Sequence, residues 1–255
     1  ALCMGLSALD YRSAGFTFTA LDVGQGQCLV YTADGETSMV DCGGVQNESG
    51  ELAARYLEGN GVFRVERLFL THPDADHCNG AAQLISRVRV KTLYLPLTAL
   101  REQSTMLQTI VETARENGTQ VRFVRENLEF PTKRGKIRVL KPDLLESGND
   151  GGLCVLAAHE KYDILITGDL TAQAEYRLLS LHTLPQAAVL VAGHHGAATS
   201  TSGALLRAVR PEAVFISAGA DNRFGHPAAQ TLARIRQSGA AVYRTDLSGT
   251  ITIRG

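Results

Sequence analysis

The chain of 255 residues has no long apolar run, no CxxC pair and no excess of charge of either sign. Its longest apolar stretch, residues 1–9, is far shorter than the ~20 residues that a membrane-spanning helix needs. The five cysteines are odd in number and widely spaced, which argues against a disulfide framework or a thiolate zinc site. We interpret them as small buried hydrophobic residues.

The balance of charge excludes a globally basic nucleic-acid-binding surface. There are 25 Lys and Arg against 26 Asp and Glu, so a polyanionic partner would have to meet a local patch or a metal. Aromatic residues make up 6% of the chain and provide few platforms for base stacking. Basic residues gather in 122–141 and Arg in 201–255. A phosphate-tracking surface and solvated strand edges both remain open as explanations.

The rest of the composition is that of a globular protein, with 44% hydrophobic residues. No Pro/Gly/Ser-rich linker divides the chain, so we expect a single domain over 16–255. Residues 1–15 are expected to be an N-terminal leader, either the remnant of a preceding membrane helix or a buried element. Strand-like runs, the first at 16–23 and the last at 250–253, surround segments of helical spacing. These helical segments are 51–58, 80–88, 98–117, 171–181, 202–209 and 227–237.

A dense group of potential metal ligands directly follows the strand-like run 66–71. It reads His72-Pro73-Asp74-Ala75-Asp76-His77, with four ligands in six residues. In an extended turn, positions 72, 74 and 76 project to one side and 77 to the other. The segment could then offer ligands to two neighbouring cations.

More Asp and His residues follow three later apolar strands. A carboxylate at the end of a buried strand is costly unless it is paired or metal-bound, and a bound cation would answer that cost. By contrast, Asp22 and Asp41 stand beside Gly at strand ends, and we interpret both as turn-forming residues. The later strand-end residues are Asp169, His194, His195 and His226.

Taken together, these segments resemble the metallo-β-lactamase superfamily, and more closely the C-terminal domain of ComEC-type DNA-internalisation competence proteins. The phosphorylcholine esterases look alike in this region. The resemblance implies an α/β fold, the αββα four-layer sandwich, with a dinuclear site at one edge of the sheets. The segments that carry it are Leu21–Gly26, Met39–Gly44, His72–His77, Leu165–Asp169, His194–Gly196 and Asn222–Pro227.

Three positions depart from the patterns of these families. The general superfamily has His where this chain has Asp74, a feature that the ComEC-like branch shares. The usual His before the Asp169 strand is absent, and Asn149–Gly152 stands in its place. The branch often has an acidic residue after Gly-Gln-Gly, whereas this chain has Gln27, to which we assign no role.

The resemblance also implies roles for the ligands. Asp169 would bridge two metals, and His194 would be free to contact substrate, with Asp76 and Asp169 as the catalytic carboxylates. Either His194 or a metal-bound water is a candidate acid for the leaving oxygen. Sequence order alone leaves open which of His194 and His195 binds metal. The implied metal sites are His72, Asp74 and His195 for one ion and Asp76, His77 and His226 for the other.

The chemistry of this ligand set favours phosphate esters. Its carboxylates, Asp74, Asp76 and Asp169, make manganese a candidate beside zinc. Two divalent ions ~3.5–4 Å apart can activate water and neutralise charge in phosphoryl transfer. We therefore expect two divalent cations, no organic cofactor, and phosphodiester hydrolysis.

The resemblance implies a sequence-tolerant DNase domain that degrades the non-transported strand during DNA uptake. Its partners would be single-stranded DNA and the membrane channel domain of the same parent protein. Its place would be the extracellular face of the cytoplasmic membrane, with a cytoplasmic location as the alternative. Two other functions stay open: hydrolysis of a small or cell-wall phosphoester such as phosphorylcholine, and metal or DNA binding without catalysis. A lactamase is the least favoured activity, by analogy.

Overall fold

The computed structural model describes residues 15–45, 48–102, 104–141, 148–160 and 162–255. The expected leader, 1–15, therefore lies outside the described residues except for its last position. The helices that the structure describes do not combine the length and hydropathy that a bilayer crossing requires.

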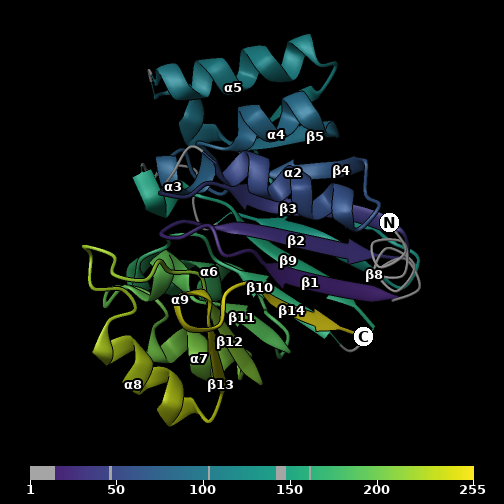
Figure 1. Cartoon of the computed structure of the whole chain (residues 1–255). Helices are drawn as coiled ribbons and strands as arrows, with labels where there is room; N and C mark the ends of the chain where they lie inside the picture. The colour runs from purple at the N-terminus through teal and green to yellow at the C-terminus, as the bar shows by residue number, and fades with distance from the viewer. Residues whose placement is uncertain (1–14, 46–47, 103, 142–147, 161) are drawn as a thin grey trace.

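Two seven-stranded sheets form the centre of the molecule, and each is part antiparallel and part parallel (Figure 1). The first sheet has the order β14-β1-β2-β3-β4-β5-β6, and the second has the order β13-β12-β11-β10-β9-β8-β7. The first sheet comprises β1 Phe16–Ala20, β2 Cys28–Ala33, β3 Glu36–Cys42, β4 Arg64–Phe69, β5 Arg89–Pro96, β6 Gln120–Val124 and β14 Ile251–Arg254. The second comprises β7 Leu128–Pro131, β8 Gly135–Leu140, β9 Cys154–His159, β10 Tyr162–Ile166, β11 Val189–Val191, β12 Ala213–Ile216 and β13 Ala241–Arg244.

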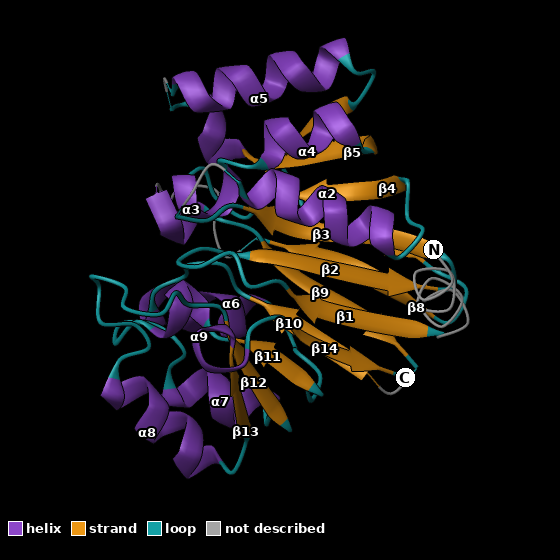
Figure 2. Ribbon diagram, viewed as in Figure 1, coloured by secondary structure: helices purple, strands orange, loops and turns teal. Residues whose placement is uncertain are grey.

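The helices cover the outer faces of the two sheets (Figure 2). α2, α4 and α5 lie on the first sheet, and α6, α7 and α8 lie on the second. The α-helices are α2 Ser49–Gly59, α3 Ala75–Cys78, α4 Ala81–Arg87, α5 Thr105–Glu116, α6 Ala172–Leu181, α7 Gly203–Val209, α8 Ala229–Ser238 and α9 Thr245–Ser248. Short 3-10 turns are η1 Leu97–Leu100, η2 Gly148–Gly151 and η3 Gly193–Gly196. The expected αββα sandwich is confirmed.

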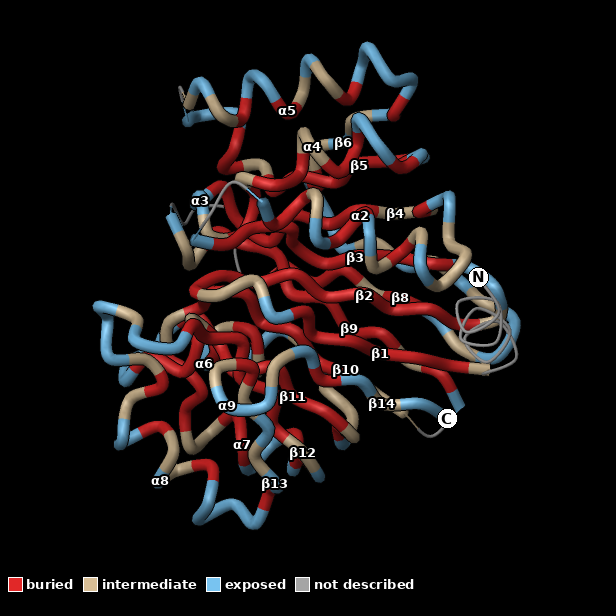
Figure 3. Tube along the Cα trace, viewed as in Figure 1, coloured by how far each residue is buried: buried red, intermediate tan, exposed pale blue. Residues whose placement is uncertain are grey.

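The main core lies between the sheets and consists of buried side chains from strands of both. Figure 3 shows the central strands of both sheets coloured as buried along most of their length. Phe18 of β1 stacks on Phe215 of β12 with ring centroids 5.8 Å apart. Two further apolar layers separate the sheets from their helices. The four described cysteines are buried and free, as expected. Burial of this kind is the dominant favourable contribution to folding.

The structure differs from the sequence prediction at three elements. The helix expected over 98–117 is divided, because the hydroxyl of Ser104 accepts the Leu107 N–H and caps α5 at a new start. β7 was not expected, yet it forms a hairpin with β8 at the edge of the second sheet. The ligand-rich segment is not an extended turn throughout, since α3 forms a helical turn over its second half.

The topology places the parallel strand ends at one edge of the sandwich. β3, β4, β5 and β6 are parallel neighbours in the first sheet, and β10, β11, β12 and β13 are parallel neighbours in the second. The loops after β3, β4, β10, β11 and β12 meet at this edge. Ligands in open α/β sheets bind at the carboxyl ends of strands, so this edge is where a site is expected.

Candidate metal centre

An inner cluster of three buried side chains joins the two halves of the chain. Nε2 of His77 lies 3.0 Å from Oδ1 of Asp169, and Nε2 of His72 lies 3.6 Å from Oδ2. The rings of His72 and His77 are 4.0 Å apart, centroid to centroid. One ligand atom of each residue falls within 4.8 Å of the others. The sequence prediction that Asp169 meets the first ligand segment therefore has the required geometry.

A second cluster shares His77 with the first. Nε2 of His195 lies 3.2 Å from Nε2 of His77 and 3.2 Å from Oδ2 of Asp76. Asp76, His77 and His195 again offer ligand atoms within 4.8 Å of one another. His77 faces both clusters, so its imidazole stands at the centre of the donor set.

The place of His195 differs from the sequence-based grouping, which put it with His72 and Asp74. The structure groups it with Asp76 and His77. Two features cause this: His194 and His195 both have positive φ, and Nδ1–H of His195 donates to the carbonyl of Ser217, on the neighbouring strand end, at 2.8 Å. This hydrogen bond turns Nε2 of His195 toward α3.

Three of the residues expected at the site stand at its rim. The side chain of His194 is 33% exposed, with Nε2 3.5 Å from Oδ2 of Asp169. The side chain of Asp74 is 53% exposed, with Oδ2 3.7 Å from Nε2 of His72. The ring of His226 lies 5.6 Å from that of His194 and 6.4 Å from that of His195. His226 therefore belongs to neither tight cluster, contrary to its grouping with Asp76 and His77.

Asp41 supports the centre from beneath, and its interpretation as a turn former is wrong. It is fully buried, and its Oδ2 accepts the Nδ1–H of His77 at 2.7 Å. Thr71 donates twice to Asp41, from its backbone N–H at 2.7 Å and from its hydroxyl at 2.8 Å. A weaker form of the signal used for Asp169 marks it in the sequence, since Asp41 follows the apolar pair Met39 and Val40 near the end of β3. Asp22 does form the expected turn and accepts the Gly24 N–H.

The segment 149–152, which replaces the usual His, has a structural role. Asp150 accepts the N–H and the hydroxyl of Thr171, both at 3.0 Å, and so fixes the start of α6. Gly152 packs closely against the backbone of Thr71 and the side chain of His72. The segment thus supports the base of the first cluster, and its acidic residue points to α6.

The surroundings keep the carboxylates ionised. Burial disfavours the charge of Asp169, but the imidazoles of His77, His72 and His195 hold its pKa well below the ordinary value. Burial likewise opposes the charge of Asp76, yet the hydrogen bond from His195 and the nearby His77 lower its pKa to about 2. Burial, aided by His77, lowers the pKa of His72 to about 4. The centre thus combines carboxylates with an imidazole that stays neutral.

The donor set fits a divalent cation. Among the described residues, four site atoms are buried and lack a hydrogen-bond partner: Nε2 of His72, Oδ1 of Asp169, Nδ1 of His194 and Nδ1 of His226. Buried polar atoms are nearly always hydrogen-bonded, and the gathering of these four at one edge of the sheets is what an ion site offers. Imidazole suits zinc and carboxylate suits manganese or magnesium.

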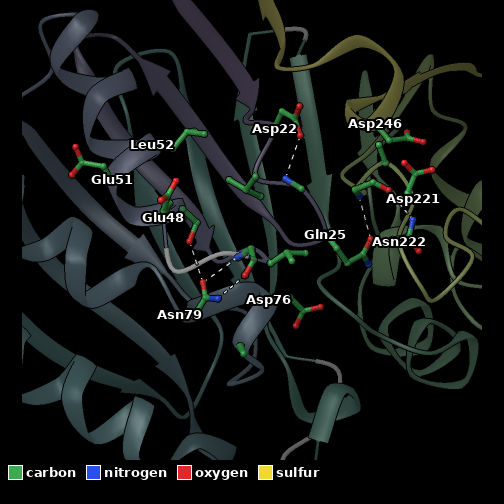
Figure 4. A pocket seen from close by; sticks show the side chains of 18 of the residues that line it. Asp22, Gln25, Glu48, Glu51, Leu52, Asp76, Asn79, Asp221, Asn222 and Asp246 are labelled. Atoms are coloured by element: carbon green, nitrogen blue, oxygen red, sulfur yellow. Dashed lines mark hydrogen bonds between the residues drawn. The ribbon is translucent and has the colours of Figure 1, made fainter.

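A groove of about 1660 Å³ opens beside Asp76 (Figure 4). The loops around Gln25, Asn79 and Asn222 contribute to its walls. Phe224, on the loop that precedes His226, is 55% exposed along the groove. The lining includes two arginines, Arg55 and Arg223. Its acidic residues are Asp22, Glu48, Glu51, Asp76, Asp221 and Asp246.

Comparison with known proteins agrees with this architecture. Residues 21–220 match the metallo-beta-lactamase superfamily. The chain is 28% identical over 252 residues to ComE operon protein 3 of Bacillus subtilis (strain 168), covering 92% of this chain and 32% of that protein. It is 30% identical over 236 residues to Competence protein ComA of Neisseria gonorrhoeae, and the match covers 91% of this chain and 31% of that protein. The chain thus spans about a third of the length of these relatives.

Solved structures show the same fold at low sequence identity. A diphosphatase from the PhnP family superposes with a TM-score of 0.54 at 11% identity, covering 93% of this chain and 97% of that one. MEM-A1, a subclass B3 metallo-beta-lactamase from a soil metagenome library, superposes with a TM-score of 0.50 at 13% identity, covering 78% and 84%. At these identities the likeness concerns the fold alone.

Proposed function

The chain belongs to the metallo-β-lactamase superfamily, and from this premise we propose that it is a metal-dependent phosphodiester hydrolase acting on DNA. The observation that carries the proposal is the set of buried, unpartnered donors around Asp169, in which carboxylate and imidazole combine. In such a mixed centre the imidazoles suit zinc and the carboxylates suit manganese, and either ion stabilises charge on phosphoryl oxygens.

The ligands would be shared between two divalent ions. His72 and Asp169 would hold one and Asp76 and His195 the other, while His77, whose Nε2 alone is not bonded to Asp41, would serve one of the two, with Asp74 and His226 closing the rim. Oδ1 of Asp169 lies 3.0 Å from Nε2 of His77 and Oδ2 lies 3.6 Å from Nε2 of His72, so both oxygens would be available to the ions. When bound, divalent ions act as Lewis acids on a phosphoryl oxygen and lower the pKa of water.

His194 is the residue placed to handle the leaving group. Its side chain is the more exposed member of the His194-His195 pair and lies over Asp169. Nε2 lies 3.5 Å from Oδ2 of Asp169, so the ring stands at the mouth of the centre. Donation of a proton from the protonated imidazole to the departing oxygen would complete cleavage by general acid catalysis and leave the neutral imidazole.

DNA is proposed as substrate because the relatives include proteins named for competence and recombination. Within this proposal the chain is one domain of a longer membrane protein, stands on the extracellular face of the cytoplasmic membrane, and cleaves the strand that is not transported. Accessibility of an introduced surface cysteine to a membrane-impermeant reagent in intact cells tests the location. Labelling only after lysis would support the cytoplasmic alternative.

Incubation with single- and double-stranded DNA tests the activity. Manganese, magnesium or zinc is added in turn, and product length is followed on denaturing gels. We expect shortening of single-stranded DNA that an Asp169→Ala preparation, purified in parallel, does not show. Equal shortening by the variant would reveal a contaminating nuclease, and metal binding without any cleavage would favour a non-catalytic domain.

A small phosphoester is the second candidate substrate, and the acidic groove favours it. Five acidic residues line the groove beside Asp76, and of these Glu51 pairs with Arg55 and Arg87 and Asp246 pairs with Arg244. The remaining three, Asp22, Glu48 and Asp221, would disfavour a polyanion and attract a cationic group attached to a phosphate. p-Nitrophenyl phosphorylcholine is the probe. Faster turnover of this compound than of bis-p-nitrophenyl phosphate, with no cleavage of DNA, would replace the DNase proposal.

A further inference from the structure

Gln27 directly precedes β2 and makes hydrogen bonds to three residues near the candidate metal centre, Asp76, Gly43 and Asp41. Its backbone N–H donates to the carbonyl of Asp76 at 2.9 Å, and its own carbonyl accepts the Gly43 N–H at 3.0 Å. Its side-chain Nε2 donates to Oδ2 of Asp41 at 2.8 Å. The side chain is 3% exposed. A buried amide therefore links the loop before β2 to the ligand segment.

Two glycines make this approach possible. A Cβ at Gly26 would collide with the backbone of Gly43, Gly44 and Asp76, and a Cβ at Gly43 would collide with the backbone at 76–77. The loop before β2 thus lies directly under α3. Only with these close backbone contacts does the Gln27 side chain reach Asp41.

The Gln27 amide completes the hydrogen bonding of Asp41. Oδ1 of Asp41 accepts the Thr71 N–H, while Oδ2 accepts from the Thr71 hydroxyl, from Gln27 and from Nδ1 of His77. All these groups are donors to Asp41, so the carboxylate acts purely as an acceptor. An amide at position 27 supplies its hydrogen bond without adding a second charge beside the buried carboxylate.

The hydrogen bonds of Asp41 affect the metal centre through the orientation of the His77 imidazole. With Nδ1–H held on Asp41, the imidazole presents Nε2 to Asp169 and His195. Hydrogen bonds to the distal nitrogen of a metal-binding His orient the ring and raise its basicity as a ligand.

We propose that Gln27 is a positioning residue that acts through Asp41 to hold His77 for a divalent cation. The inference rests on the proposed metal-dependent function of this centre. It goes beyond that function by assigning metal affinity to a neutral side chain outside the ligand set. The expected effect is a weaker site when the amide donor is removed, with the fold retained.

The test compares Gln27→Met with Gln25→Met. Gln25 lies two residues away, is also 3% exposed, and uses its side chain to accept the Gly219 N–H at 3.2 Å. Each substitution therefore removes one buried hydrogen bond from the same loop. Zinc affinity is measured by competition with a chelator, and the Nδ1–H resonance of His77 is followed by NMR in the zinc-loaded protein.

We expect Gln27→Met to weaken zinc binding about 10-fold. This is the low end of the range for removing a group that supports a metal-binding side chain by hydrogen bonds. The His77 Nδ1–H resonance should shift and exchange faster with water. Gln25→Met should leave both readouts unchanged. If Gln27→Met does not fold, Gln27→Asn keeps a polar side chain but withdraws the amide by one methylene, and the same losses are expected.

A double-substitution cycle tests the path through Asp41. In the Asp41→Asn background, Gln27→Met should cause little further loss of zinc affinity. Loss of stability in Gln27→Met with unchanged zinc affinity and resonance would overturn the proposal, as would equal weakening by Gln25→Met. These readouts need no cleavage. A wild-type protein that binds zinc but hydrolyses no phosphodiester would refute the proposed function alone.

Discussion

The two halves of the molecule hold their metal-ligand candidates in different ways. The first half is the sheet that carries the His72–His77 segment, and the second half is the sheet that carries Asp169, His194, His195 and His226. In the first half, the imidazole of His77 rests on a side chain, the buried carboxylate of Asp41. In the second half, His194 and His195 sit in a loop whose backbone is held in shape by side chains that do not touch the ligands. Glu175 accepts the N–H groups of Thr201 and Ser202 at 2.6 and 2.8 Å.

The second half extends this pattern to neighbouring loops. The Thr201 hydroxyl in turn accepts the Gly193 N–H at 3.0 Å. Arg234 of α8 donates to the carbonyls of Ala198 and Ser200 at 3.0 and 2.8 Å. The Asn222 side chain donates to one carbonyl on each side of its loop, those of Gly219 and His226.

This contrast predicts which property each substitution should affect. A substitution of a side chain that supports a ligand in the first half, such as Asp41, alters the orientation and basicity of that ligand directly, so metal affinity should respond first. A change behind the second half loosens a loop with left-handed residues, so the free energy of unfolding should respond first. The predictions below test this division, beginning with the residue that joins both halves.

Asp169→Ala should have the largest effect, because its carboxylate contacts imidazoles from both halves. We expect hydrolysis to be abolished while circular dichroism still shows a folded α/β protein. Metal content is counted by mass spectrometry after reconstitution with manganese or zinc. Near-normal turnover with an unchanged metal content would remove Asp169 from the centre.

The histidines of the second half should separate into two classes. His195→Ala and His226→Ala should each lower metal occupancy, whereas His194→Ala should lower turnover about 100-fold with occupancy largely intact, as expected for loss of a general acid. Occupancy and turnover are measured on the same preparations. Loss of occupancy in His194→Ala but not in His195→Ala would exchange their roles.

Asp41→Asn and Glu175→Gln form a direct test of the comparison. Asp41→Asn should weaken metal binding about 10- to 100-fold, since it removes the carboxylate behind His77. Glu175→Gln should instead cost about 1–3 kcal/mol of stability, because an amide group then faces backbone donors.

Chelator competition and urea unfolding of the metal-free proteins supply the two scales for this pair. If Asp41→Asn and Glu175→Gln lose metal affinity and stability in the same proportion, the two halves do not differ in the way proposed.

The smallest effects are expected for the basic residues of 122–141. The structure places some of them beside carboxylates and others at different edges of the sheets. Arg134 pairs with Asp34 and Glu160, while Lys136 and Arg138 both lie near Glu129. Arg122 is exposed on β6, and Arg125 follows it at the sheet edge that carries the site. Lys133 lies in the β7–β8 turn at the opposite edge.

If DNA is the substrate, reversing the charges of Arg122 and Arg125 should weaken its binding and reduce the salt dependence by about one per lost phosphate contact. Reversing Lys136 and Arg138 is the matched control, since both are already near a carboxylate. Bis-p-nitrophenyl phosphate should be cleaved as before by each variant. Equal loss on both substrates would indicate damaged folding.

Much of the fold and of the donor set was predictable from local patterns. Six helical segments were recognised from apolar spacing, and five of them agree with α2, α4, α6, α7 and α8 within a few residues. Asp169 was identified because an ionised group at the end of an apolar strand needs a partner. The same argument applies to Asp41, but Gly43 and Gly44, which follow Cys42, led instead to its interpretation as a turn former.

The sequence by itself determined which residues could serve as ligands, because donor chemistry and the alternation of strands and helices are local properties. Only the tertiary structure decided how they are grouped. His77 faces two clusters, and His195 turns to α3 instead of His72, because a hydrogen bond to Ser217 fixes its ring. β14 returns to pair with β1 across more than two hundred residues, and Gln27 reaches Asp41 under α3. Such contacts depend on the packing of distant segments, which spacing along the chain does not specify.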